Sequence, residues 1–238
     1  MLNFLGNILG YVMRFIYDTL SKIGTEPENF SYFAMSIIVA TLFIKLITLP
    51  LNLKAAKQMK KTQELQPQAK EIQIKFKHDP QTANMKIQQL YRENGASMTG
   101  GCLPILVQMP VILAFFRVMQ NPGLYVFNQP GHFESISKTF LWIKDLTLAD
   151  PHWYGLPLLV GLATFLQSFT TPKVGTPEQQ EQMASMNTMN YIMPLMFFWF
   201  ALKYPGGLAL YWITNTLFTA IQQLITNRTL IFKKKGEQ

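Results

Sequence analysis

The sequence predicts an all-α integral membrane protein with five membrane-spanning helices, an interfacial helix at the N-terminus and a cytoplasmic helical hairpin. Of the 238 residues, 49% are hydrophobic and only 14% are charged, and the charges gather in a few blocks. Several apolar stretches approach the roughly 20 residues that a helix needs to cross a bilayer. A soluble domain of this length does not require such stretches, so the composition favours a membrane protein.

Residues 1–29 are predicted to form an extracytoplasmic amphipathic helix followed by a linker. Apolar residues, among them Leu5, Leu9 and Val12, recur at helical spacing with polar residues between them. This pattern favours a helix that lies on the membrane surface. The segment lacks the basic start and the small-residue cleavage site of a signal peptide. An uncleaved membrane anchor is the alternative interpretation.

Five apolar stretches are predicted to span the membrane: residues 30–51, 100–120, 153–171, 189–204 and 205–227. The last two are joined by a tight turn at Tyr204-Pro205-Gly206-Gly207, because proline and glycine there end one helix and permit the reversal. The fourth span has only about fourteen apolar residues, which predicts local thinning of the bilayer. Alternatively, the true ends of this helix differ from the predicted ones, which would explain the short span equally well.

The distribution of lysine and arginine predicts the orientation of the chain. Residues 52–99 carry nine of them, whereas the 121–152 loop carries only Lys138 and Lys144. Basic loops stay in the cytoplasm, so the N-terminus is expected outside, and the 172–188 loop and the basic 228–238 tail inside.

Residues 52–99 are expected to form a hairpin of two helices that is broken at His78-Asp79-Pro80. Its basic surface suits lipid headgroups, substrate chains or a ribosome. A role limited to orientation and solubility needs no partner and stays open as the alternative.

Lys45 is the most informative single residue, because it lies within the apolar span 30–51 and no acidic residue occurs in any of the five spans. A lysine at the centre of a bilayer costs about 2.5 to 3.5 kcal/mol on insertion scales. The cost favours water around the side chain. A lysine that snorkels to the cytoplasmic headgroups is the alternative.

Polar residues recur at helical spacing in the same spans, and with the predicted topology most of them lie in the inner half of the membrane. We expect them to line a hydrated groove that opens to the cytoplasm. The predicted groove residues are Lys45, Thr41, Gln108, Gln167, Ser168, Trp212, Asn215 and Thr219. Hydrogen bonding between helices would explain the neutral residues equally well, but not the charge.

Several short motifs follow one another along residues 30–228. They are Lys45 with Leu49-Pro50-Leu51, Leu65-Gln66-Pro67, Gly100-Gly101-Cys102-Leu103-Pro104, Gln108-Met109-Pro110, Trp142-Ile143-Lys144-Asp145-Leu146, Asp150-Pro151, Pro205-Gly206-Gly207-Leu208 and Tyr211-Trp212. In this order they resemble the YidC/Oxa/Alb family of membrane-protein insertases, in its bacterial form.

The resemblance implies a five-helix core with a positively charged, hydrophilic groove in the inner leaflet, which inserts and helps to fold membrane proteins without nucleotide hydrolysis. It implies that Lys45 supplies the charge, beside Gln108, Gln167, Trp212 and Asn215. Many bacterial relatives have arginine at the position of Lys45, which adds a planar fork of donors. The implied partners are newly made membrane proteins and the bilayer of the bacterial cell membrane, and the ribosome and the Sec translocon stay open as further partners.

Other classes of function fit the sequence less well. A small transporter or channel that uses Lys45 is the alternative, but the spans contain neither an acidic partner for a proton relay nor an internal repeat. His78, His132 and His152 are isolated, so we expect no catalysis, no cofactor and no metal site. The single cysteine, Cys102, excludes an intrachain disulfide. Because the net charge of +8 gathers beside the spans, direct nucleic-acid binding is not expected.

Overall fold

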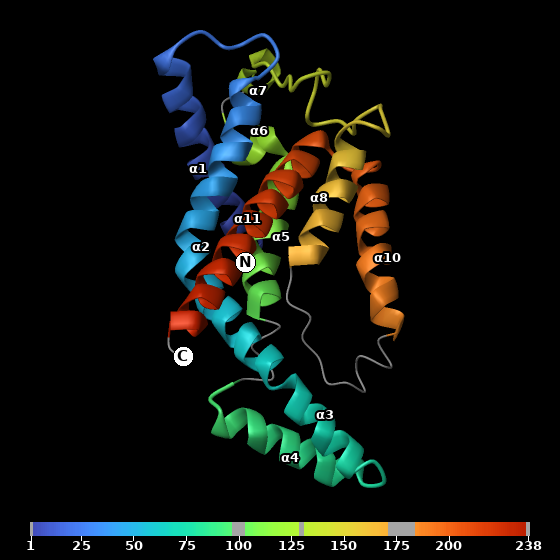
Figure 1. Cartoon of the computed structure of the whole chain (residues 1–238). Helices are drawn as coiled ribbons and strands as arrows, with labels where there is room; N and C mark the ends of the chain where they lie inside the picture. The colour runs from blue at the N-terminus through green and yellow to red at the C-terminus, as the bar shows by residue number, and fades with distance from the viewer. Residues whose placement is uncertain (1, 97–102, 129–130, 171–183, 237–238) are drawn as a thin grey trace.

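The regular elements of the structure, a computed structural model that describes residues 2–96, 103–128, 131–170 and 184–236, are all helices (Figure 1). This confirms the predicted all-α class for the described residues. Helices suit an apolar chain because they satisfy their backbone hydrogen bonds internally. The helices are α1 (Leu2–Ile23), α2 (Tyr32–Glu64), α3 (Gln66–Lys75), α4 (Pro80–Glu93), α5 (Leu103–Gln120), α6 (Pro122–Tyr125), α7 (His132–Ser135), α8 (Leu156–Thr170), α10 (Ala184–Ala201) and α11 (Gly206–Gly236).

Helix α11 lies at the centre of a bundle, where it packs against α2, α5 and α8 (Figure 1). Helix α10 packs mainly on α8, and α1 packs on α2 and α5. The core contains large buried side chains, and the ring of Tyr211 stacks on that of Phe115 with centroids 4.0 Å apart. A tight turn between α10 and α11 lets Gly207 approach α2 and α5 so closely that a Cβ there would meet the Met119 sulfur.

The lengths of the helices bear on the predicted membrane spans. By length and composition, one described helix, α2, is long and apolar enough to cross a membrane. Helices α5, α8 and α10 contain shorter apolar stretches, at Leu106–Gln120, Leu156–Thr170 and Ile192–Ala201. The apolar character of the bundle is consistent with a membrane protein, and the count of five spans stays a prediction. Most of the predicted 172–188 loop lies outside the described residues.

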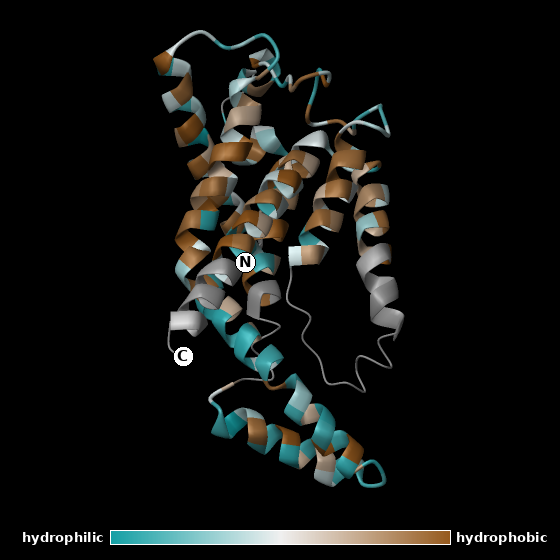
Figure 2. Cartoon of the chain, viewed as in Figure 1, coloured by the Kyte–Doolittle hydropathy of each residue, from teal (hydrophilic) through white to brown (hydrophobic). Residues whose placement is uncertain are grey.

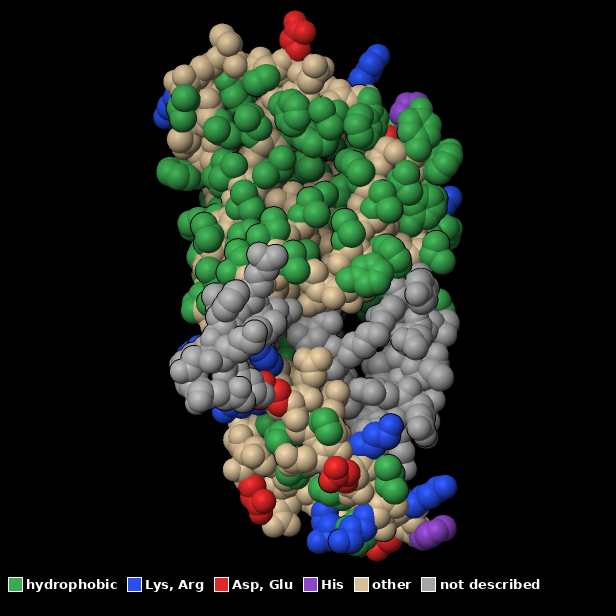
Figure 3. All heavy atoms as spheres, viewed as in Figure 1, with side chains coloured by type: hydrophobic (Ala, Val, Ile, Leu, Met, Phe, Trp, Pro, Cys, Tyr) green, Lys and Arg blue, Asp and Glu red, His purple; other side chains and the backbone are tan. Residues whose placement is uncertain are grey.

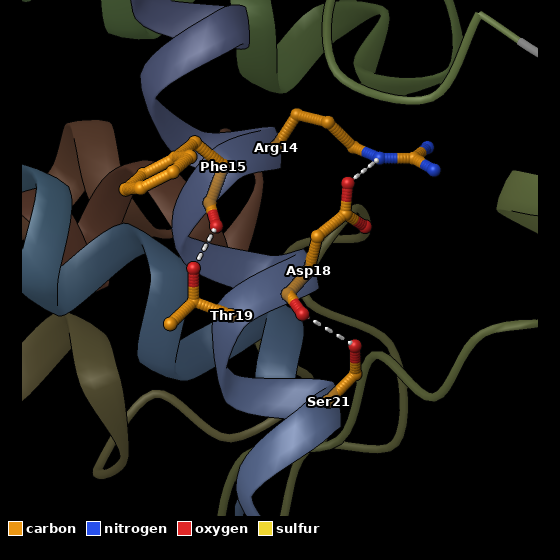
Figure 4. A network of polar contacts seen from close by, with 5 residues as sticks. All are labelled: Arg14, Phe15, Asp18, Thr19 and Ser21. Atoms are coloured by element: carbon orange, nitrogen blue, oxygen red, sulfur yellow. Dashed lines mark hydrogen bonds and ion pairs between the residues drawn. The ribbon is translucent and has the colours of Figure 1, made fainter.

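Helix α1 presents apolar side chains on two sides. Leu9 and Met13 are buried in the bundle, whereas Tyr11 and Phe15 are exposed. An ion pair of 2.8 Å joins Arg14 and Asp18 in the second half of the helix (Figure 4). The helix therefore buries some of its apolar side chains in the bundle and exposes others, and its predicted place at the membrane surface stays a prediction.

Helices α3 and α4 form a hairpin at one end of the bundle (Figure 1). A small separate core of Leu65, Ala69, Ile87, Tyr91 and Ala96 holds it together. The hairpin is largely hydrophilic and the bundle largely hydrophobic (Figure 2). Charged side chains cluster on the hairpin, and hydrophobic side chains cover the visible face of the bundle (Figure 3). A cytoplasmic hairpin and a membrane-embedded bundle would have this distribution.

Asp79 caps the N-terminus of α4, because its carboxylate accepts hydrogen bonds from the backbone N–H and the hydroxyl of Thr82. These two hydrogen bonds hold the pKa of Asp79 below its usual value. The bond from the Thr82 hydroxyl has the larger effect, and the bond from the Thr82 backbone N–H the smaller. The cap therefore contributes stability above the pKa of the unfolded carboxyl, and this contribution is lost as the pH falls through the folded pKa.

Replacing this cap should loosen the start of α4. We expect Asp79→Ala to speed hydrogen exchange of the first-turn amides several-fold at neutral pH, since the Thr82 N–H loses its acceptor. Asp79→Asn retains an acceptor and should exchange at nearly the wild-type rate. Equal protection in the alanine variant and the wild type would show that the cap contributes nothing.

Candidate functional site: a polar cavity around Lys45

Lys45 is buried in the bundle, with only 6% of its surface exposed, although it carries a charged group. Its ammonium donates a hydrogen bond of 2.9 Å to the Thr219 hydroxyl on α11 and lies 3.5 Å from the Gln108 side-chain oxygen on α5. Among the described residues it has no ion-pair partner. Two neutral dipoles therefore solvate the charge, and an ammonium has three donors to satisfy.

A second layer of hydrogen bonds holds these acceptors in place. The Gln108 amide group donates to Asn215 Oδ1 at 3.1 Å and to the Tyr211 hydroxyl, so its oxygen is left to face Lys45. The Thr219 hydroxyl donates to the backbone oxygen of Asn215 at 2.7 Å. The network thus joins α2, α5 and α11 around one cation, and such a network fixes the relative positions of its members.

The cavity beside this network is narrow. It is lined by residues of α2, α5 and α11 that include Thr41, Lys45, Gln108, Tyr211 and Asn215, and it has room for about one water molecule. The Thr41 hydroxyl faces its own helix, where it donates to the Ile37 oxygen. The space beside Lys45 is therefore too small for a carboxylate side chain unless neighbouring side chains move, and the wide, open groove stays a prediction.

The structure brings five of the eight predicted groove residues together around this cavity: Lys45, Thr41, Gln108, Asn215 and Thr219. The other three lie apart from it. Trp212 turns toward α8 and α10, where its indole N–H donates to Thr164 at 3.1 Å and its ring stacks on Phe197. Gln167 and Ser168 lie near the end of α8, and the Ser168 hydroxyl donates to its own helix at Phe165.

Trp212 lines a second hollow, which we call the apolar cleft. The cleft has a volume of about 330 Å³ and lies between α5 and α10, over α8 and α11. Its lining is almost entirely apolar: Met109, Ile112, Leu113, Phe116, Val160, Phe197, Phe200, Ala201, Tyr204, Leu208, Ala209 and Trp212. The cleft was not predicted from the sequence. Apolar residues of a membrane helix that face lipid, the protein core or a cleft recur with the same spacing, so the spacing cannot tell these environments apart.

Tyr211 is a member of the network that sequence reasoning also missed. It lies one turn before Asn215 and two turns before Thr219, so the same helical spacing that selected those residues could have found it. Its ring is fully buried against Phe115, and its hydroxyl accepts from Gln108. Tyr211 therefore orients the Gln108 amide and makes no hydrogen bond of its own to Lys45.

Tyr211→Phe tests this orienting role, because it removes one acceptor and keeps the stacked ring. We expect the variant to lose about 1 kcal/mol of stability, and insertion of a membrane-protein substrate with an acidic segment to slow several-fold. Tyr211→Leu removes both the hydroxyl and the stacked ring, so any loss beyond that of the phenylalanine variant reports the packing of the ring. Wild-type stability and wild-type insertion in the phenylalanine variant would contradict the role.

Comparisons with known proteins support the resemblance seen in the motifs. The 60Kd inner membrane protein family matches residues 26–235. The membrane protein insertase YidC of Fusobacterium nucleatum is 38% identical over 217 residues, which make up 89% of this chain and 96% of that protein. The insertase YidC of Oceanobacillus iheyensis is 37% identical over 212 residues, or 85% of this chain and 77% of that protein.

A longer relative shows the same similarity over part of its length. The membrane protein insertase YidC of Wolinella succinogenes is 38% identical over 201 residues, and the matched region is 84% of this chain but only 34% of that protein. The match with the family covers most of the chain and includes Lys45, both hollows and the hairpin. This chain therefore belongs to the 60Kd inner membrane protein family, whose relatives include the YidC insertases.

Proposed function

We propose that this protein inserts other membrane proteins into the bacterial inner membrane and helps them to fold, without nucleotide hydrolysis. The single observation that carries the proposal is Lys45, a buried cation that has only neutral partners among the described residues. Membership of the family supports it, because the relatives above are named insertases. The proposal extends their named activity to this chain.

An acidic side chain of the entering protein would take the place of Thr219 and Gln108 at Lys45. A charge-assisted hydrogen bond is roughly twice as strong as a neutral one, so a carboxylate competes well for the ammonium. At 4 Å the attraction between unit charges is about 4 kcal/mol at an effective dielectric constant of 20. This transient pairing would lower the free energy of a polar segment partway through the bilayer.

The hydrophobic segment of the entering protein would supply the driving force. Burial of apolar surface releases about 25 cal/mol per Å², so a segment long enough to span the membrane needs no nucleotide to remain there. The exposed apolar side chains of α8 and α10, among them Leu166, Phe169 and Trp199, offer a lipid-like surface along which it could slide. Lys45 would act on the polar end and the bilayer on the apolar end.

The proposed orientation places the basic hairpin and tail in the cytoplasm and the N-terminus outside. Nine basic residues between positions 52 and 99 support it, because basic loops are retained inside. The cavity would then open toward the inner leaflet, where a new chain arrives. The hairpin is a suitable contact for a ribosome, and the bundle for the Sec translocon, as further partners.

Reconstitution tests the proposal directly. Purified protein in liposomes without nucleotide should insert a small single-spanning substrate, measured as protection of its translocated end from added protease. A transporter or channel that uses Lys45 is the second candidate, favoured by the buried cation alone. Solute flux without insertion would support that candidate, and a requirement for ATP would contradict the proposed mechanism.

A further inference from the structure

The apolar cleft is partly open to its surroundings, and residues of α5 and α10 form two of its walls. The two walls approach each other at one end, where the rings of Phe116 and Tyr204 have centroids 5.6 Å apart. No described residue occupies the space between the walls. In a bilayer, apolar groups fill such a space, because water has no polar partner there and an empty space forfeits dispersion contacts.

Two cationic residues are the sequence neighbours of Phe116 and Tyr204, which line the cleft. Arg117 follows Phe116 in sequence and lies one helical turn beyond Leu113, which lines the cleft. Lys203 precedes Tyr204 in the turn between α10 and α11. Among the described residues, neither side chain has a hydrogen-bond or ion-pair partner. Two positive charges that no described residue neutralises are therefore adjacent in sequence to one end of an otherwise apolar cleft.

We propose that the apolar cleft binds an anionic phospholipid, with an acyl chain between α5 and α10 and the phosphate at Arg117 and Lys203. The cleft offers hydrocarbon contacts along its length and charge at one end, as a phospholipid requires. The arginine fork suits phosphate oxygens in bidentate geometry, and the lysine adds a second charge. Both cations lie near the helix ends at the 121–152 loop, where the headgroups of the adjacent leaflet are expected.

The bound lipid would keep the cleft filled while no substrate is present. An apolar helix that moves along α5 and α10 would have to displace the acyl chain, and the lipid would refill the space afterwards. This consequence rests on the proposed insertion function, whereas the binding site itself does not.

Quenching of Trp212 fluorescence by brominated lipids tests the site, because Trp212 lines the cleft. The other tryptophans, Trp142, Trp153 and Trp199, are replaced by phenylalanine, and the protein is reconstituted with small fractions of brominated phosphatidylglycerol or brominated phosphatidylcholine. We expect the anionic lipid to quench at about fivefold lower mole fraction, the effect of one extra interaction of about 1 kcal/mol with a surface cation. Arg117→Gln with Lys203→Gln should abolish the preference, and Arg117→Lys should keep most of it.

A single-tryptophan variant that retains Trp199 is the matched control, since this residue is exposed on α10 and does not line the cleft. It should be quenched equally by both lipids. Equal quenching of Trp212 by both lipids would overturn the proposal in favour of bulk lipid. Quenching of Trp199 but not of Trp212 would also overturn it, because the cleft would then be closed or filled by protein. Neither reading depends on insertion activity, so a failure of the proposed function would be seen separately in the liposome assay.

Discussion

Lys45→Ala should slow the insertion of a substrate with an acidic N-terminal segment about 10- to 100-fold. The expected loss corresponds to one hydrogen-bonded charge interaction of about 1.5 to 3 kcal/mol. Alanine removes the ammonium that Thr219 and Gln108 now hold in the centre of the bundle. Lys45→Arg should retain most of the activity, because it keeps the charge, although the longer fork must fit a narrow cavity. The measurement is the initial rate of insertion into proteoliposomes.

Two controls separate the charge of Lys45 from its packing. Lys45→Met keeps most of the side-chain volume without the charge and should resemble the alanine variant. Lys54→Ala removes an exposed lysine from the same helix and should insert normally. A substrate whose acidic residues are replaced by neutral ones should be inserted at the same rate by the wild type and by all of these variants. If alanine and arginine at position 45 support equal rates, Lys45 has no part in the mechanism.

Asp150→Ala should produce the largest loss of stability, about 2 to 4 kcal/mol. The carboxylate is buried, with 5% of the residue exposed, and it accepts three hydrogen bonds. The donors are the Trp142 indole N–H at 3.1 Å, the His152 N–H at 2.9 Å and the Leu156 N–H at 2.8 Å, at the start of α8. The variant leaves these donors without their acceptor and frees the 121–152 loop from the helix it caps.

The loss can be measured by equilibrium unfolding in mixed micelles of a mild detergent and dodecyl sulfate. Asp145→Ala is the matched control in the same loop, because among the described residues the Asp145 carboxylate accepts only from Thr147, and the residue is half-buried. It should cost clearly less than Asp150→Ala. Similar unfolding midpoints for Asp150→Ala and Asp145→Ala would contradict a special role for Asp150. The stability of Asp150→Asn should lie between those of the wild type and the alanine variant.

The helix that contains Pro50 shows which parts of the fold could be predicted from the sequence. The apolar pattern correctly indicated a helix from about residue 30, and Ser31 caps it by accepting from the Ala34 N–H. The predicted span ended at residue 51, but α2 continues through Pro50 to Glu64. Proline removes one hydrogen bond from a helix without always ending it. The end of an apolar stretch therefore does not predict the end of the helix that contains it.

The sequence by itself determined the family, the helical class and the isolation of Lys45. Each of these depends on residue order or composition: the ordered motifs, the long apolar stretches and the absence of acidic residues from the spans. Helical spacing also selected Gln108, Asn215 and Thr219, which do lie beside Lys45.

Only the tertiary structure decided which polar faces meet. Trp212 carried the same periodic signal as Asn215, yet it turns to α8 and α10, and the Gln108 amide is oriented by Tyr211. The apolar cleft and the narrowness of the polar cavity are likewise features of packing. The physical reason is that periodicity defines the face of one helix, whereas a site is made where several helices pack, and their spacing and rotation depend on side chains distant in the sequence.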